Sequence, residues 1–429
     1  MTPMTEAFLH YCWKHRLLAN EVFTTGNQKV VIISMGEVNN DAGPDFFNSK
    51  LMIGDTEWAG NVEIHLRSSD WSRHGHSADK RYNNVILHVV YENDAEVVLE
   101  NGRRPATLEL KNQLRPGVWE NYCSLQRPSV DDTIPCAKVL PQIPDFTIKS
   151  YLERLAVERL EQKSEVVKRL LTESGNSWET CCYWAVARFF GGKVNAVPFE
   201  LLAKSIDMRV FAKIKQSAFR IEALLFGQAG MLDGDFSDDY PNALNKEYEY
   251  QRKVYNLSPI DGYLWKFFRV RPSGFPTIRI SQFADFIFKS NGLFSKLLET
   301  TDINSLLSFF SVSASEYWQT HYHFDKPVKS RSKALGGDFA ESIVINAWVP
   351  TLMLYGVEYQ QQKYKDSVLQ ILSNLPCENN AIIKKWCAAG LKPENALHSQ
   401  ALIQLYNEYC RKKRCLSCQI GYKVLVTNV

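Results

Sequence analysis

The spacing of apolar residues changes once along this 429-residue chain, and that change limits the folds open to it. Up to about residue 110, short β-branched runs are separated by turn residues, a pattern typical of β-strands. From residue 148 onward, apolar residues recur at helical spacing, with Glu, Lys and Arg between them. Between these regions, residues 127–147 contain four prolines and lose all periodicity. The sequence therefore predicts an α/β region followed by a large helical region.

The predicted fold class is α+β, with an N-terminal helix over residues 1–23 and then a mainly antiparallel or mixed sheet. We expect three segments: an α/β domain at 1–125, a proline-rich linker at 126–147, and an all-α domain at 148–429 that ends in a cysteine cluster. The expected strands are 29–34, 45–53, 58–66, 82–91, 96–99 and 106–110.

Composition and charge narrow the environment of the chain. Lys and Arg total 50 against 47 Asp and Glu, a formal charge of +3 that does not by itself indicate a nucleic-acid binder. No run approaches the roughly 18 apolar residues of a membrane span, and charged or histidine side chains interrupt the N-terminal segment where a signal peptide would be apolar. Ten scattered cysteines fit a reducing compartment. The prediction is a cytoplasmic protein without membrane association, whose protein partners are left open.

Two carboxylates fall on strands that we expect to be neighbours. Asp45 follows the Gly43-Pro44 break, and Glu63 lies in the next expected strand, with His65 on the same face because strand side chains alternate. Adjacent strands lie about 4.8 Å apart, so the two carboxylates can share a divalent ion. Such an ion can lower the pKa of a bound water and stabilise charge on a phosphodiester.

The Gly-Pro-Asp-Phe segment at 43–46 and the Val-Glu-Ile-His segment at 62–65 resemble the motif of the PD-(D/E)XK nuclease superfamily. The resemblance covers roughly residues 1–110 and implies a restriction-endonuclease-like fold, in which Asp45 and Glu63 bind Mg²⁺ or Mn²⁺. It makes Glu37 the candidate for an upstream acidic ligand. His65 departs from the family pattern, which has Lys at this position. Imidazole can bind metal or act as a base but lacks a fixed positive charge, so the departure affects hydrolysis more than metal binding.

Histidines are concentrated beside this motif. Four of the nine in the chain, His65, His74, His76 and His88, lie between positions 65 and 88. Imidazoles with carboxylates suit Zn²⁺, Mn²⁺ or Fe²⁺ better than Mg²⁺, so a His/Asp metal site is a rival interpretation. Alternatively, the loop recognises phosphate through basic residues such as Arg73. A third interpretation is an exposed loop next to a hydrogen-bonded histidine in the sheet.

Three cysteines near the end, Cys410, Cys415 and Cys418, follow the pattern C-x4-C-x2-C with basic residues between them. A Cys-x2-Cys pair is the usual chelating element of a structural zinc site, which needs four ligands. The sequence offers Cys377, Cys387 and His398 as the fourth without choosing among them. A [4Fe–4S] centre and thiols without metal are the alternatives.

Over nearly its full length, the sequence resembles an uncharacterised bacterial family of domains of unknown function. The motifs at 43–46 and 62–65, the 70–76 segment, the basic 271–279 loop and the terminal cysteines carry this resemblance. The leading functional hypothesis is metal-dependent hydrolysis of nucleic acid by Asp45, Glu63 and His65. One alternative is a non-catalytic scaffold that binds nucleic acid or protein through an eroded nuclease-like domain. The other is a His/Asp metalloenzyme acting on a small molecule.

Overall fold

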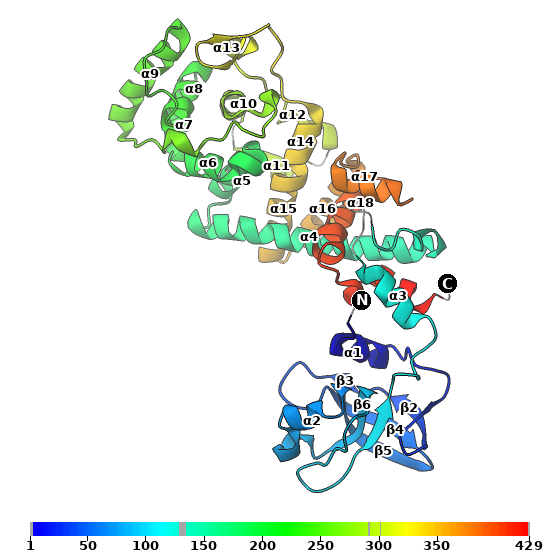
Figure 1. The fold of residues 1–429 in the computed structure, drawn as a ribbon. Helices are drawn as coiled ribbons and strands as arrows, with labels where there is room; N and C mark the ends of the chain where they lie inside the picture. The colour runs from blue at the N-terminus through cyan, green and yellow to red at the C-terminus, as the bar shows by residue number, and fades with distance from the viewer. Residues whose placement is uncertain (1–2, 128–133, 291, 301, 428–429) are drawn as a thin grey trace. The chain divides into compact units, whose positions relative to one another are not determined.

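The computed structural model describes residues 3–127, 134–290, 292–300 and 302–427, which form two compact units (Figure 1). The first unit comprises residues 1–149, 385–391 and 405–429, and the second comprises 150–384 and 392–404. Both units are discontinuous in sequence, whereas the sequence predicted consecutive segments. The predicted domain boundaries at 125 and 147 therefore stay a prediction, and residues 128–133 of the expected linker lie outside the described residues.

A seven-stranded mixed sheet forms the centre of the first unit. Along its hydrogen-bonded path the order is β1-β2-β4-β5-β6-β7, and β3 pairs with β4 beside this path. The strands are β1 (Val22–Phe23), β2 (Lys29–Ser34), β3 (Glu37–Val38), β4 (Phe46–Ile53), β5 (Thr56–Arg67), β6 (Val85–Glu92) and β7 (Ala106–Glu109). Neighbours from β1 to β5 pair antiparallel, while β5, β6 and β7 are parallel. The predicted α+β class with a mixed sheet is confirmed.

Burial explains why β6 lies inside the sheet. Its residues Val85–Val90 are all buried, a continuous run that is typical of strands covered on both faces. His88 is the polar member of this run and is fully buried. On the neighbouring β5, residues from Gly60 to His65 are also buried. The parallel register places Glu63 opposite His88, so polar groups meet deep inside an apolar sheet.

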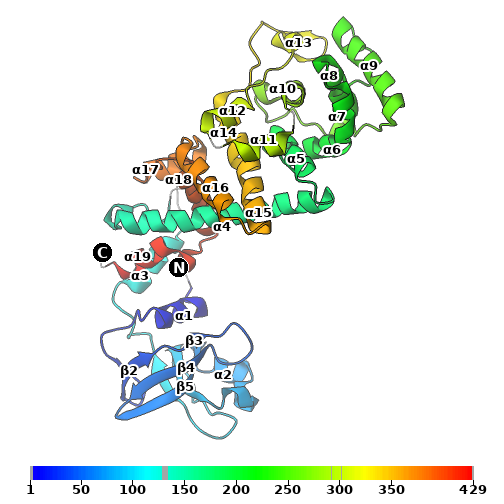
Figure 2. The same cartoon turned by 180° about the vertical axis from the view of Figure 1, so that it is seen from behind.

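Short helices and turns complete the first unit. They are α1 (Glu6–Lys14), α2 (Asp70–Arg73), α3 (Val118–Gln126), α19 (Gln419–Val426), η1 (His76–Ala78), η2 (Lys80–Tyr82), η3 (Leu140–Gln142), η7 (Leu405–Cys410) and η8 (Cys415–Ser417). Helix α1 begins after the capping residue Thr5 and lies against β5 on one face of the sheet (Figures 1 and 2). Helix α3 packs on α19, where the Asn121 side chain donates to the Val424 and Thr427 carbonyls, each at 3.1 Å.

Two expectations about local structure were wrong. The expected helix over 1–23 ends at Lys14, and Val22–Phe23 is a strand, because the apolar residues after Lys14 pack as extended chain. The expected strand at 96–99 is irregular. Its apolar residues Val97 and Leu99 are nevertheless buried, in a small core with Trp71, Tyr82 and Val85. The apolar residues alternate along this segment because they are buried, although the segment does not pair with a strand of the sheet.

The second unit is helical, as the sequence predicted, apart from a short hairpin of β8 (His321–His323) and β9 (Lys326–Pro327). Helices α4 and α17 have residues in both units. The helices are α4 (Asp145–Glu173), α5 (Trp178–Phe190), α6 (Gly192–Lys204), α7 (Met208–Ile214), α8 (Ala218–Gln228), α9 (Asp239–Tyr255), α10 (Pro276–Lys289), α11 (Leu293–Glu299), α12 (Ile303–Ser308), α13 (Glu316–Gln319), α14 (Gly337–Ile343), α15 (Val349–Glu358), α16 (Gln362–Asn374), α17 (Ala381–Ala388) and α18 (Ala396–Gln404). Short turns are η4 (Gly262–Leu264), η5 (Pro272–Gly274) and η6 (Val344–Trp348).

One helical stretch of the described residues, Gly337–Glu358, is long and apolar enough to cross a membrane by length and composition alone. It joins α14, η6 and α15. Its apolar window is 67% buried inside the protein, as in the core helix of a soluble protein. The predicted cytoplasmic location stays a prediction.

Candidate metal centre

Asp45 and Glu63 lie side by side, as the strand pairing requires. Asp45 directly precedes β4, and Phe46 pairs with Val62 of β5. The Asp45 backbone N–H donates to Glu63 Oε2 at 3.0 Å, and the Ile64 backbone N–H donates to Asp45 Oδ2 at 2.8 Å. Each carboxylate is thus held by the backbone of the other's strand. The structure brings these two predicted ligands together.

His10 of α1 is a neighbour that the sequence did not indicate. Its Nε2 lies 3.2 Å from Asp45 Oδ2. Burial lowers the pKa of His10, but the hydrogen bond and negative charge of Asp45 more than offset this, so the pKa is raised overall. No motif linked position 10 to position 45, because their contact depends on how α1 packs against the sheet.

Three histidines lie next to Glu63. The ligand atoms of His65, His74 and His76 lie within 4.8 Å of one another. His65 Nε2 is 3.2 Å from His74 Nδ1, and Glu63 Oε1 is 3.5 Å from His65 Nε2 and 3.2 Å from His76 Nε2. We call Glu63, His65, His74 and His76 the histidine cluster. Its donor set, three imidazoles and a carboxylate, is the type that binds Zn²⁺, Mn²⁺ or Fe²⁺.

His88 supports His65 from behind. His65 Nδ1 lies 2.9 Å from His88 Nε2, and His88 Nδ1 is buried without a hydrogen-bond partner among the described residues. If His65 Nδ1 carries the proton and donates to His88, the lone pair of His65 Nε2 faces Glu63 and His74. Burial, reinforced by the surrounding imidazoles, lowers the pKa of His65 to about 3. Burial lowers that of His88 to about 3 as well. Both rings are therefore neutral at pH 7, the form that binds metal.

The pKa of Glu63 is shifted in the opposite direction from those of His65 and His88. Burial and the nearby charge of Asp45 raise its pKa, although hydrogen bonding to His76 acts against them. A carboxylate in this position is stabilised by a cation. Aromatic rings surround the site: His76 stacks on Tyr82 with ring centroids 3.9 Å apart, and Trp71 meets His65 edge-on. These rings fix the imidazole planes and exclude water from one side.

Exposure increases across the cluster. Glu63 and His65 are buried, His76 is half-buried and His74 is exposed. An ion bound here would be reached by solvent and substrate from the His74 side. Two other predicted residues lie outside the cluster. Glu37 is exposed on β3 opposite Phe47. Arg73 is 71% exposed and pairs with Asp70 at 2.8 Å.

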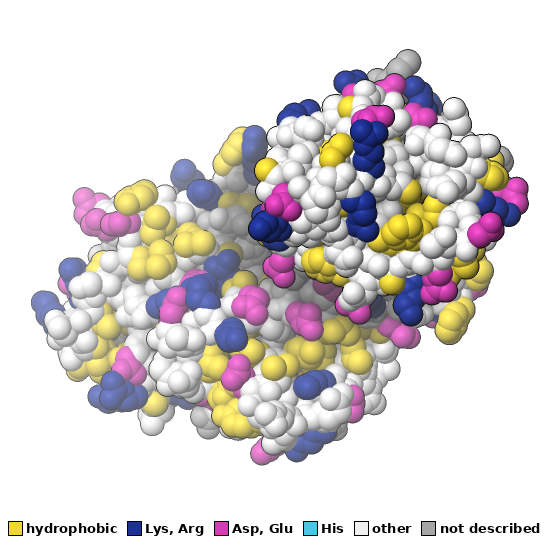
Figure 3. Space-filling model, turned by 90° about the horizontal axis from the view of Figure 1, so that it is seen from below, with side chains coloured by type: hydrophobic (Ala, Val, Ile, Leu, Met, Phe, Trp, Pro, Cys, Tyr) yellow, Lys and Arg dark blue, Asp and Glu magenta, His cyan; other side chains and the backbone are white. Residues whose placement is uncertain are grey.

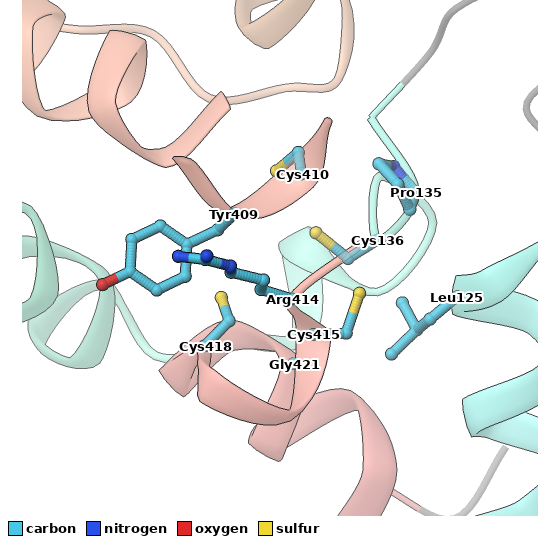
Figure 4. Close-up of a pocket in the computed structure, with 9 residues that line it drawn as sticks. All are labelled: Leu125, Pro135, Cys136, Tyr409, Cys410, Arg414, Cys415, Cys418 and Gly421. Atoms are coloured by element: carbon cyan, nitrogen blue, oxygen red, sulfur yellow. The ribbon is translucent and has the colours of Figure 1, made fainter. Parts of the chain in front are cut away.

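The predicted terminal cysteines belong to the first unit as well. Cys410, Cys415 and Cys418 line one small pocket together with Cys136 (Figure 4). We call these four residues the cysteine quartet. Cys377, Cys387 and His398, the expected fourth ligands, are not among the described residues that line this pocket. Sequence reasoning missed Cys136 because it is more than 270 positions away from the others.

Comparison with known proteins identifies the family. The model of the family described as "Protein of unknown function (DUF2851)" matches residues 6–381. The chain belongs to the DUF2851 family. This confirms the expected domain-of-unknown-function family, and the DUF2851 match includes the whole histidine cluster and Cys136 but ends before Cys410. No curated protein and no solved structure matches the chain.

Proposed function

We propose that this DUF2851 protein is a metal-dependent phosphodiesterase acting on nucleic acid, with its metal ion held by the histidine cluster. The observation that carries the proposal is the meeting of Glu63, beside Asp45, with three imidazoles within 4.8 Å of one another. The mixed sheet supports it, because an N-terminal helix followed by antiparallel and then parallel strands agrees with the resemblance to PD-(D/E)XK nucleases.

The donor set favours Mn²⁺ or Zn²⁺ over Mg²⁺. Mg²⁺ prefers carboxylate and water oxygens in octahedral geometry, whereas imidazole nitrogen suits the transition metals. His65 stands where the nuclease pattern has Lys, and its pKa of about 3 means that it supplies no positive charge at pH 7. We therefore assign His65 as a metal ligand. The altered residue changes which metal is preferred and does not by itself remove the site.

The other residues take roles that follow from their contacts. Glu63, His65, His74 and His76 would hold the ion, and Asp45 would orient Glu63 through its backbone N–H. His10 contacts Asp45 at 3.2 Å, and this contact with a carboxylate raises the pKa of His10. A bound ion of this kind lowers the pKa of its water and stabilises charge developing on a phosphoryl group. His88 keeps the ring of His65 in place through the 2.9 Å contact.

The surface charge suggests weak electrostatic binding of nucleic acid. On the face shown in Figure 3, the described Lys and Arg side chains are interspersed with Asp and Glu and do not form one continuous basic track. Near the histidine cluster, Arg73 and Arg81 are each paired with an aspartate, at 2.8 and 2.5 Å. We therefore expect few contacts to phosphate. Because the salt dependence of nucleic-acid binding grows with the number of such contacts, we expect it to be shallow.

The test combines metal binding with cleavage. Full-length protein is stripped of metal and titrated with Mn²⁺, Zn²⁺ and Mg²⁺, and each loaded form is incubated with single- and double-stranded DNA and RNA. We expect cleavage with Mn²⁺ or Zn²⁺ that falls at least about 100-fold in Glu63→Gln, a magnitude typical of removing a metal-dependent contribution to the transition state. Glu57→Gln is the matched control, because Glu57 lies on the same strand β5 and is exposed.

Each other outcome points elsewhere. Metal binding that is lost in Glu63→Gln, without cleavage of any nucleic acid, would contradict the nuclease proposal. It would support the second candidate, a metalloenzyme acting on a small molecule, which the three clustered imidazoles favour independently of the sheet. Absence of metal binding by the cluster would leave the non-catalytic scaffold.

A further inference from the structure

The cysteine quartet draws together two parts of the chain that are distant in sequence. Cys136 lies between α3 and η3, whereas Cys410, Cys415 and Cys418 follow one another at the C-terminal end of the first unit. All ten cysteines of the chain are thiols, and four of them line this one pocket (Figure 4). A buried cysteine is often only a small apolar residue, but four around one space form a chelating set.

Local structure holds each thiol in place. The Cys136 carbonyl accepts the N–H groups of Val139 and Leu140, at 3.0 and 3.2 Å. The π-helical segment η7 ends at Cys410, and π-helical turns often occur at functional sites. Cys415 and Cys418 stand at the two ends of a 3-10 turn, in which the Cys418 N–H donates to the Cys415 carbonyl at 3.3 Å. This turn gives the Cys-x2-Cys pair a fixed spacing.

The segments around this turn pack closely against it. A Cβ on Gly421 of α19 would lie 2.1 Å from the Cys415 carbonyl oxygen, so only glycine lets α19 approach the turn this closely. The loop before the turn is tied to α3: Lys413 Nζ donates to the Arg127 carbonyl at 2.9 Å, and Gln126 donates to the Lys413 carbonyl at 3.3 Å. These contacts bring the terminal cysteines to Cys136.

We propose that the cysteine quartet binds a single Zn²⁺ ion through four thiolates. The cavity that the four side chains line measures about 20 Å³. A single water needs about 10–15 Å³ on the same measure, so the space suits one ion and is too small for a four-iron cluster. Among the described residues, the ligand atoms already within 4.8 Å of one another are those of the histidine trio. The four sulfur atoms are not yet this close to one another, so zinc binding would bring the four side chains closer together.

Charge supports the choice of a cation. Burial raises the pKa of Cys410, and the charges of Cys136, Cys418 and Cys415 raise it further, so the thiols interact electrostatically. Burial and Cys418 raise the pKa of Cys415 to about 11. Zinc would displace the protons into solvent, and two negative charges would remain on a four-thiolate site. Arg414 lines the same pocket and Lys413 lowers the pKa of Cys410 and Cys415 by its charge, so these two basic residues offset that charge.

Metal analysis and cobalt spectroscopy on the full-length protein test the site. We expect Cys136→Ser and Cys418→Ser each to contain one equivalent of zinc less than the native protein, whatever ion the histidine cluster holds. Replacement of zinc by Co²⁺ should give strong sulfur-to-cobalt charge-transfer absorption, which imidazoles and carboxylates do not produce. Cys123→Ser is the control, because Cys123 lies on α3 of the same unit and is not among the described lining residues.

A second measurement needs no substitution. Alkylation followed by mass spectrometry should show the four thiols protected in the zinc-loaded protein and modified after chelation. Unchanged zinc and cobalt spectra in Cys136→Ser would overturn the proposal. So would equal alkylation of the quartet with and without chelator. Iron with inorganic sulfide in the purified protein would replace the single ion with a cluster. The sulfur-to-cobalt absorption and the alkylation pattern depend neither on the histidine cluster nor on nuclease activity.

Discussion

The histidine cluster and the cysteine quartet are built in opposite ways within the same unit. The histidine cluster comes from residues 63–76, on a strand and the turns that follow it, and its geometry is fixed by pairing within the sheet. The cysteine quartet joins residues 136 and 410–418, on turns that α3 and α19 hold together. The first contains the buried ring of His65, which burial keeps neutral, and has one exposed side at His74. The second has thiols that must lose protons and that line a small cavity.

This difference suits the histidine cluster to catalysis and the cysteine quartet to stabilising the fold. A metal site with one solvent-exposed side can exchange water and substrate. A closed set of four thiolates leaves no position for substrate, and its binding free energy contributes to folding. The two clusters are therefore expected to respond differently to pH, to packing changes and to loss of single residues.

The largest expected difference is in how metal affinity depends on pH. Zinc must displace protons from the thiols of the quartet but not from His65, whose pKa is about 3. Each proton released makes affinity tenfold stronger per pH unit, so we expect the dissociation constant of the quartet to fall about 10²- to 10⁴-fold from pH 7 to 8. At the histidine cluster His65 has no proton to lose at Nε2, so we expect a smaller change there than at the quartet.

Zinc titrations of Glu63→Gln, which keeps the quartet, and of Cys136→Ser, which keeps the histidine cluster, separate the two slopes. Equal pH dependence of zinc affinity in the two variants would contradict the difference in proton release between the two sites.

The next effect is on packing. Gly421→Ala places a methyl group against the Cys415 carbonyl, at 2.1 Å before relaxation. We expect the free energy of unfolding of the first unit to fall by about 3 kcal/mol, the upper range for overpacking, although Ala is the better helix former. Zinc at the quartet should be lost while metal at the histidine cluster is kept. Denaturant unfolding measures this, with Gly26→Ala as control because Gly26 lies in the first unit and a Cβ there would meet its nearest atom at an ordinary 3.7 Å.

A third prediction concerns acid. An unfolded histidine titrates near pH 6.5, whereas burial holds the pKa of His88 at about 3. Between these values the unfolded chain binds more protons, so stability falls as pH falls. At pH 5, His88 should cost the metal-free protein about 2 kcal/mol relative to pH 7. The raised pKa of Glu63 acts in the opposite direction. Denaturant unfolding of His88→Phe at both pH values should show a smaller loss than the native protein; an unchanged loss would contradict this account.

The smallest expected effect is at His10. His10→Ala removes the 3.2 Å contact with Asp45 and should weaken Mn²⁺ binding at the histidine cluster by about fivefold, the equivalent of about 1 kcal/mol for one hydrogen bond. Zinc at the quartet should not change. Calorimetric titration measures both, with Lys14→Ala as the control because Lys14 is exposed at the end of the same helix. Equal losses at both sites would show general destabilisation.

Features formed by residues close together in the sequence could be predicted, whereas contacts between distant segments could not. Alternation and turn residues located β2, β4, β5, β6 and β7, and the hairpin between β4 and β5 made the meeting of Asp45 and Glu63 predictable. The contacts of His10 and Cys136 depend on packing between distant segments, which no spacing encodes. Residues 96–99 show the limit of alternation, because Val97 and Leu99 are buried beside Trp71 without joining the sheet.

The discontinuity of the first unit has a consequence for the order of events during translation. Cys136 is synthesised 282 residues before Cys418, which belongs to the same unit. At about 5–20 residues per second, the ribosome takes roughly 15–55 s to make the intervening chain. For that time Cys136 lacks its three partner cysteines, while the strands that build the histidine cluster are already complete. The sheet can form before the helical region is made, but the cysteine quartet can assemble only after Cys418 has been synthesised.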